Sequence, residues 1–80
     1  MHLLDSIAKT IKRIRKTRGL SQEQLAELSG LDRTYISGVE RGLRNITIAS
    51  LERIITALQL TPNEFFAIAT RETDHDFPTK

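Results

Sequence analysis

Between residues 33 and 41 the sequence places arginine and hydroxyl side chains where a short helix would expose them on one face. The set consists of Arg33, Thr34, Ser37 and Arg41. An arginine can donate two hydrogen bonds to guanine N7 and O6, and a threonine or serine can pair with a base or touch a thymine methyl group. A helix that carries such side chains outward is therefore suited to reading base edges in the major groove of DNA.

Two short helices around a glycine would hold this face in place. Ser21, followed by Gln24 three residues later, forms a capping box that starts one helix. Gly30 permits a tight turn, and Asp32 is a good N-cap for the next helix. Short helices joined by a glycine-containing turn are the signature of a helix-turn-helix unit. The residues that we expect to face inward are Leu25, Ala26, Leu28, Ile36 and Val39.

Three further helices surround this pair, and no segment reads as a strand. The first is predicted over residues 5–18 from an apolar stripe at helical spacing. Thr47 begins the fourth, and residues 61–64 open the fifth with a threonine cap, a proline and a glutamate. We therefore expect an all-α domain of five helices over residues 1–70. Residues 71–80 are acidic and without periodicity, which predicts a flexible tail.

The composition narrows the class of protein further. The chain has 80 residues, a formal net charge of +2 and no cysteine, which excludes disulfides and thiolate zinc sites. No apolar run approaches the roughly 18 residues that span a bilayer. The first ten residues lack the architecture of a signal peptide, so we expect an intracellular, cytoplasmic protein. A basic stretch without acids, residues 9–18, either attracts a polyanion or solvates one helix face.

The run from Ile14 to Gly42 resembles the Cro and phage-repressor type of helix-turn-helix domain, which is also called Xre-like. Within that family, the run DRTYISGVERGLRNIT is most similar to the controller proteins of restriction–modification systems. The resemblance covers residues 5 to about 69. It implies a lambda-repressor-like homodimer that binds palindromic operator DNA and regulates transcription of its own gene and of the endonuclease gene. No cofactor is implied.

The helix face and the resemblance together assign individual contacts. Base contacts are expected from Arg33, Thr34 and Ser37. Contacts to the DNA backbone are expected from Gln22, Tyr35, Arg41, Arg44 and Asn45. For Gln22, the positive end of the helix dipole supports a phosphate contact, although a plain helix start is the alternative. Tyr35 could equally be a partly buried core residue, and residues 44–45 could form a solvated loop.

Glu40 is an acid on the helix that we expect to face DNA. The resemblance implies that it pairs with Arg15 on the first helix, so we assign both residues a structural role. An acidic residue that contacts RNA polymerase is the alternative, for which Glu23 and Glu27 are also candidates.

A second copy of the chain is expected because one helix-turn-helix unit reads only a few base pairs. The fourth and fifth helices carry more apolar residues than one small core needs. We therefore predict a dimer interface formed by Leu51, Ile55, Leu58, Phe65 and Phe66. The alternative is that the domain buries all of them internally.

Other functions have weaker support. A phage-type repressor or an antitoxin-like module that acts through a protein partner could use the same fold. The basic first helix could bind RNA or DNA without selectivity, although few exposed aromatic residues are available for stacking on single strands. No serine has a histidine and an acid around it, and His2 and His75 lack partners for a metal site, so we expect no enzyme and no metal.

Overall fold

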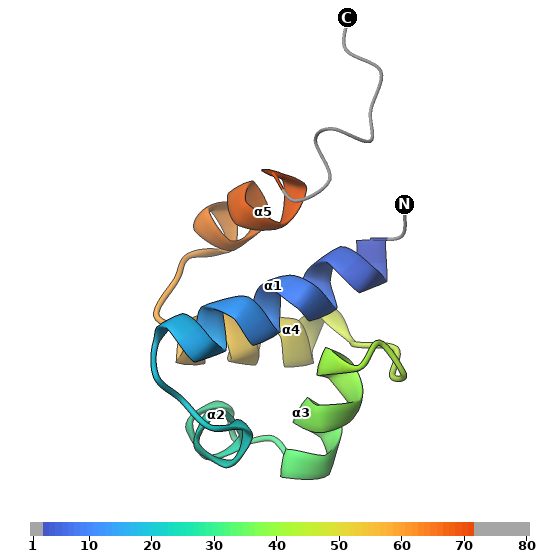
Figure 1. Cartoon of the computed structure of the whole chain (residues 1–80), viewed down its shortest axis with the longest axis vertical. Helices are drawn as coiled ribbons and strands as arrows, with labels where there is room; N and C mark the ends of the chain where they lie inside the picture. The colour runs from blue at the N-terminus through green and yellow to red at the C-terminus, as the bar shows by residue number, and fades with distance from the viewer. Residues whose placement is uncertain (1–2, 72–80) are drawn as a thin grey trace, which may run out of the picture.

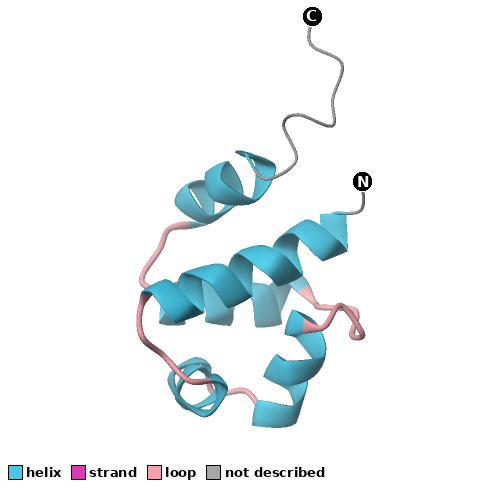
Figure 2. Ribbon diagram, in the orientation of Figure 1, coloured by secondary structure: helices cyan, strands magenta, loops and turns pink. Residues whose placement is uncertain are grey.

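The computed structural model describes residues 3–71, which fold into five α-helices (Figure 1). In chain order they are α1 (Leu3–Thr17), α2 (Gln22–Ser29), α3 (Arg33–Glu40), α4 (Ile48–Ala57) and α5 (Pro62–Arg71). No strand occurs among these residues (Figure 2), so the all-α prediction is confirmed. Helix α5 includes Arg71, which was expected to begin the tail. The rest of the predicted tail, residues 72–80, lies outside the described residues.

The helices begin where the sequence carries start signals. At α2 the Ser21 hydroxyl accepts a hydrogen bond from the Gln24 amide at 3.0 Å, and the Gln24 side chain accepts one from the Ser21 amide at 2.8 Å. The same reciprocal pair opens α5, between Thr61 and Glu64. Asp32 accepts a hydrogen bond from the backbone of the second residue of α3. These bonds satisfy amides that a helix start otherwise leaves unpaired.

Helices α1 to α4 each end near a left-handed residue, which is a glycine in the first three cases and Gln59 in the fourth. Gly30 ends α2 with φ +71°, which lets the next amide, that of Leu31, return to the Ala26 carbonyl at 3.0 Å. Gln59 takes the same role after α4 with φ +64°, although it is not a glycine. A side chain in this region of the Ramachandran plot is strained. Among the described residues, Gln59 is therefore the one left-handed position that is not occupied by glycine.

The core lies where α1, α2, α3 and α4 meet, with α5 laid against α1 and α4. Its fully buried side chains include Ile11, Leu25, Ile36, Val39, Ile54, Leu58 and Phe65. Ile36 and Val39 are the inward residues of α3, as predicted, and their complete burial keeps this short helix on the domain. Apolar burial of this kind stabilises by about 25 cal/mol for each Å² removed from water.

The dimer interface predicted from the sequence is not available on this fold. Leu51, Ile55, Leu58 and Phe65 are each at most 4% exposed within a single chain. Helix α4 packs on α2, and α5 packs on α1, so the apolar faces of both helices are already covered. The four residues therefore belong to the core of the protomer, and only Phe66, which is half-buried, keeps part of its surface.

Leu28 is more exposed than its helix position predicted, and a second apolar residue, Ile48, is also highly exposed. Leu28 was expected on the inner side of α2, and it lies on the outer side instead. Ile48, in the first turn of α4, is 81% exposed. Both stand at the edge of an apolar stripe, where a rotation of the helix by a fraction of a turn decides between core and surface.

Candidate DNA-binding surface

Helix α3 presents one exposed face and one buried face. Arg33 and Thr34 in its first turn are exposed, and Ser37, one turn later, is half-buried. Ile36 and Val39 occupy the opposite, buried side. Helices α2 and α3 lie at one end of the domain and α5 lies at the other (Figure 1). The first turn of α3 can therefore enter a groove without obstruction from α5.

The loop after α3 folds back over the same helix. The guanidinium carbon of Arg44 lies 5.6 Å from the centre of the Tyr35 ring. A Cβ atom on Gly38 would stand only 2.7 Å from Arg44 Cγ, so the absence of a side chain at this position makes room for the arginine. A cation over an aromatic ring contributes about 0.5–1 kcal/mol at an exposed site. Arg44 therefore lies across the middle of α3, and its side chain belongs to the exposed surface beside Tyr35.

The other residues expected at the DNA backbone surround this helix. Arg41 is the C-cap of α3 and is exposed, and Asn45 is exposed in the following loop. Tyr35 is half-buried and packs against the core, as one of the two interpretations expected, and its contact to the DNA backbone stays a prediction. Arg41, Arg44 and Asn45 are thus exposed at or just after the end of α3, and Gln22 is half-buried at the start of α2.

Behind this surface, Arg15 and Glu40 form an ion pair. Arg15 Nε donates to Glu40 Oε2 at 2.6 Å, and Arg15 Nη2 donates to Glu40 Oε1 at 3.0 Å. The two side chains are 9% and 2% exposed. Arg15 Nη1 also donates to the Leu20 carbonyl at 2.8 Å, and Gln22 Nε2 donates to Glu40 Oε1 at 3.1 Å. The last residue of α3 is therefore bound to α1 and to the first residue of α2, and Arg15 in turn binds the α1–α2 turn.

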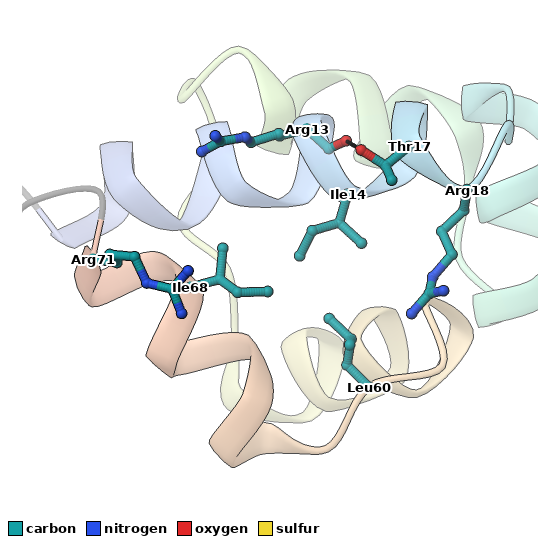
Figure 3. A pocket seen from close by; sticks show the side chains of 7 residues that line it. All are labelled: Arg13, Ile14, Thr17, Arg18, Leu60, Ile68 and Arg71. Atoms are coloured by element: carbon teal, nitrogen blue, oxygen red, sulfur yellow. Dashed lines mark hydrogen bonds between the residues drawn. The ribbon is translucent and has the colours of Figure 1, made fainter.

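A separate pocket of about 590 Å³ lies between α1 and α5, away from α3 (Figure 3). Its lining consists of Arg13, Ile14, Thr17, Arg18, Leu60, Ile68 and Arg71. Arg18 is held there by a hydrogen bond from its Nε to the Leu58 carbonyl at 2.9 Å. None of the residues predicted to contact DNA lines this pocket.

Within residues 3–71, no group of three or more histidine, cysteine or acidic residues is arranged to hold a metal ion. His2 and His75 lie outside the described residues. None of the described helices combines the length and the apolarity needed to cross a membrane.

Comparisons of the sequence and of the structure with known proteins agree with one another. A helix-turn-helix family model matches residues 11–65. The control protein C.SmaI of Serratia marcescens is 47% identical over 58 residues, which cover 72% of this chain and 69% of that protein. The crystal structure of the wild-type restriction–modification controller protein C.Esp1396I has a TM-score of 0.87 and 47% identity, and the match covers 90% of this chain and 95% of that one.

Several further solved structures that are similar to this chain are also of C.Esp1396I. One is a tetramer in complex with its natural 35 base-pair operator, with a TM-score of 0.86, 47% identity, and coverage of 90% of this chain and 95% of that one. Others are variants in which an arginine, a threonine or a tyrosine at three consecutive positions was replaced. In this chain the sequence Arg-Thr-Tyr occurs once, at residues 33–35.

Proposed function

Because the chain belongs to the helix-turn-helix family and, within it, to the control proteins of restriction–modification systems, we propose that it binds a palindromic DNA operator as a homodimer and regulates transcription. The genes under its control are its own and that of the endonuclease. Its family consists of regulators and not of enzymes. Since its target is genomic DNA, we infer that it acts in the cytoplasm.

One observation carries this proposal. Arg33 and Thr34 stand exposed on the first turn of a helix whose other side is completely buried. This is the arrangement in which the N-terminal residues of a recognition helix reach base edges. Arg33 is the candidate for a bidentate contact to guanine, and Thr34 for a base or a thymine methyl group, with Ser37 deeper along the groove.

Contacts to the DNA backbone would hold the helix in register. The side chains of Arg44 and Tyr35 already contact each other on the surface of α3. This pair is suited to binding a phosphate of the DNA backbone at the edge of the groove. Arg41 and Asn45 are exposed near this pair, and Gln22 is half-buried at the start of α2. Such contacts add affinity and orientation but carry no sequence information.

A dimer is needed because two half-sites, centred about 34 Å apart, supply the selectivity that one recognition helix lacks. With the core residues excluded, we place the interface at the end of the domain where α1 begins and where the α3–α4 loop leads into α4 (Figure 1). Exposed apolar side chains occur there in all three segments, namely Leu3, Leu43 and Ile48. The Asp5 carboxylate, which lies 3.4 Å from a Cβ built on Gly42, shows that the start of α1 adjoins the loop.

A contact with RNA polymerase would use the outer side of α2. Glu23 and Glu27 are exposed there, next to the exposed Leu28. Glu40 does not suit this role, because its carboxylate is buried and bound by three hydrogen bonds. Acids on α2 could meet a basic surface of polymerase bound beside the operator.

Binding to three DNA probes at two salt concentrations tests the proposed function. The probes are a palindromic duplex that the protein selects from a random pool, a scrambled duplex and the corresponding single strand. We expect the selected duplex to bind at least about a thousandfold more tightly than the scrambled one at physiological salt. Equal affinity for all three probes would indicate non-selective binding, and no affinity for any of them would indicate a module that acts through a protein partner.

A further inference from the structure

Gln22 lies where the candidate DNA surface meets the buried ion pair behind it. Its Nε2 donates to Glu40 Oε1 at 3.1 Å, and the same oxygen accepts from Arg15 Nη2 at 3.0 Å. Gln22 is the first residue of α2, and Glu40 is the last residue of α3. A continuous line of hydrogen bonds therefore runs from the start of α2, through the end of α3, to α1.

The carboxylate determines which way the Gln22 carboxamide points. An ionised glutamate only accepts hydrogen bonds, so the Gln22 nitrogen must face Glu40 and its oxygen must face away. The other carboxylate oxygen of Glu40 is taken by Arg15 Nε at 2.6 Å. Glu40 therefore has one partner on α1 and a second on α2, and the two together fix the direction of its side chain.

A small rotation of α3 at its C-terminal end displaces the residue at its N-terminal end. Arg33, the first residue of α3, is seven residues from Glu40. At 1.5 Å per residue the distance is roughly 10 Å, so a rotation of about 10° at Glu40 moves Arg33 by about 2 Å. Binding geometries fail at displacements of about 0.5 Å. A small loss of orientation at Glu40 is therefore enough to misplace the residue that we assign to base reading.

Apolar packing does not replace this restraint. Ile36 and Val39 keep α3 against the core, but apolar contacts are non-directional. The hydrogen bonds of Glu40 depend on angle, and they oppose rotation of the helix about its packed face. Gln22 adds the link from α2, which packs directly on α3.

From this geometry we propose that Gln22 is a positioning residue for base reading, which acts through Glu40 on the orientation of α3. The proposal rests on the proposed function, since orientation of α3 matters only if this helix reads DNA. A positioning role and a phosphate contact predict different effects on DNA binding. A lost phosphate contact weakens binding to all sequences, whereas a misplaced reading helix weakens binding to the correct sequence most.

The variant Gln22→Met tests this role, because methionine keeps the length and the apolar stem of glutamine but cannot donate to Glu40. Affinities are measured for the duplex selected by the wild-type protein and for a scrambled duplex, over a series of salt concentrations. We expect the ratio of the two affinities to fall roughly three- to tenfold at each salt concentration, in line with the loss of one hydrogen bond. A loss of stability alone would lower both affinities equally.

The variant Glu23→Gln is the matched control. It lies next to Gln22 on the exposed side of α2, and it should leave the affinity ratio unchanged. If Gln22→Met weakens binding to both duplexes by the same factor, the effect is that of a lost phosphate contact or of lost stability, and the positioning role is overturned. If the wild-type protein does not discriminate between the duplexes, the proposed function itself fails. If it does discriminate and Gln22→Met retains the full ratio, only the positioning role fails.

Discussion

Replacing Arg15 by methionine should destabilise the domain more than any substitution on its DNA-binding surface. The guanidinium is almost completely buried, and it donates two hydrogen bonds to Glu40 and one to the Leu20 carbonyl. Methionine fills a similar volume but leaves the Glu40 carboxylate, at 2% exposure, with Gln22 as its remaining side-chain donor. Removal of one partner from a buried pair costs about 3–5 kcal/mol.

This cost is large for a domain of 80 residues. Typical stabilities of about 0.05–0.15 kcal/mol per residue amount to roughly 4–12 kcal/mol here. A loss of about 3–5 kcal/mol should lower Tm by about 12–40 °C, since each kcal/mol shifts Tm by about 4–8 °C in a domain of this size. Circular dichroism during thermal and urea unfolding measures the change. All variants must be compared at one protomer concentration, because dimerisation stabilises the folded state.

The double variant Arg15→Met with Glu40→Leu separates a buried charge from lost packing. Without either charge, the site holds two apolar side chains, and we expect at least about 2 kcal/mol of the stability to return. The Leu20 carbonyl still lacks its donor, which leaves a residual cost of about 1 kcal/mol. The reasoning is refuted if Arg15→Met costs less than about 1 kcal/mol, as an exposed pair would. It is also refuted if the double variant loses the sum of the two single losses.

Four further predictions follow from the same geometry. Arg33→Ala should weaken operator binding by about 1–3 kcal/mol and relax preference at one base position, and an equal loss on scrambled DNA would contradict base reading. Gly38→Ala should displace Arg44 and lower operator affinity in a binding assay, and undiminished affinity would show that the arginine is not needed there. The helix gain of about 0.5–1 kcal/mol is offset by the lost Arg44–Tyr35 contact, so stability in urea unfolding should change little. Gln59→Gly should raise stability by about 0.5–1 kcal/mol in the same unfolding assay, because φ +64° strains any side chain, and a decrease would argue against strain. Ile48→Asp should shift sedimentation equilibrium toward monomer if the start of α4 meets a second copy, whereas an unchanged dimer would place the interface elsewhere.

Helix positions could be read from the sequence because their signals are local. The capping pair of Ser21 and Gln24 and the N-cap Asp32 act within three residues, and their hydrogen bonds form as the spacing predicts. Gly30 likewise adopts the left-handed conformation that its turn needs. Such features depend on the chain itself and only weakly on what packs around it.

The sequence did not show in the same way which apolar residues are buried and which lie on the surface. Leu51 and Ile55 were assigned to a dimer interface because α4 has more apolar residues than one helix face requires. These two residues are buried because α2 and α5, from other parts of the chain, pack against α4. The spacing of apolar residues along a helix does not show which other helix covers its apolar face. The contact of Arg44 with Gly38 is similar, since it forms across the turn that ends α3 and needs the loop conformation to be known. A glycine inside a short helix is the one signal that could have indicated it.

The distribution of contacts on α3 separates selectivity from stability. Arg33 and Thr34 have exposed side chains, so replacing them should change stability by less than about 0.5 kcal/mol. Ile36 and Val39 hold the helix against the core, and their replacement should lower stability before it alters base preference. The same scaffold can therefore support different operators through changes in its first turn. Measuring the free energy of unfolding for a set of Arg33 variants tests this separation. A stability loss above about 1 kcal/mol in most of them would show that residues assigned to base contacts also stabilise the fold.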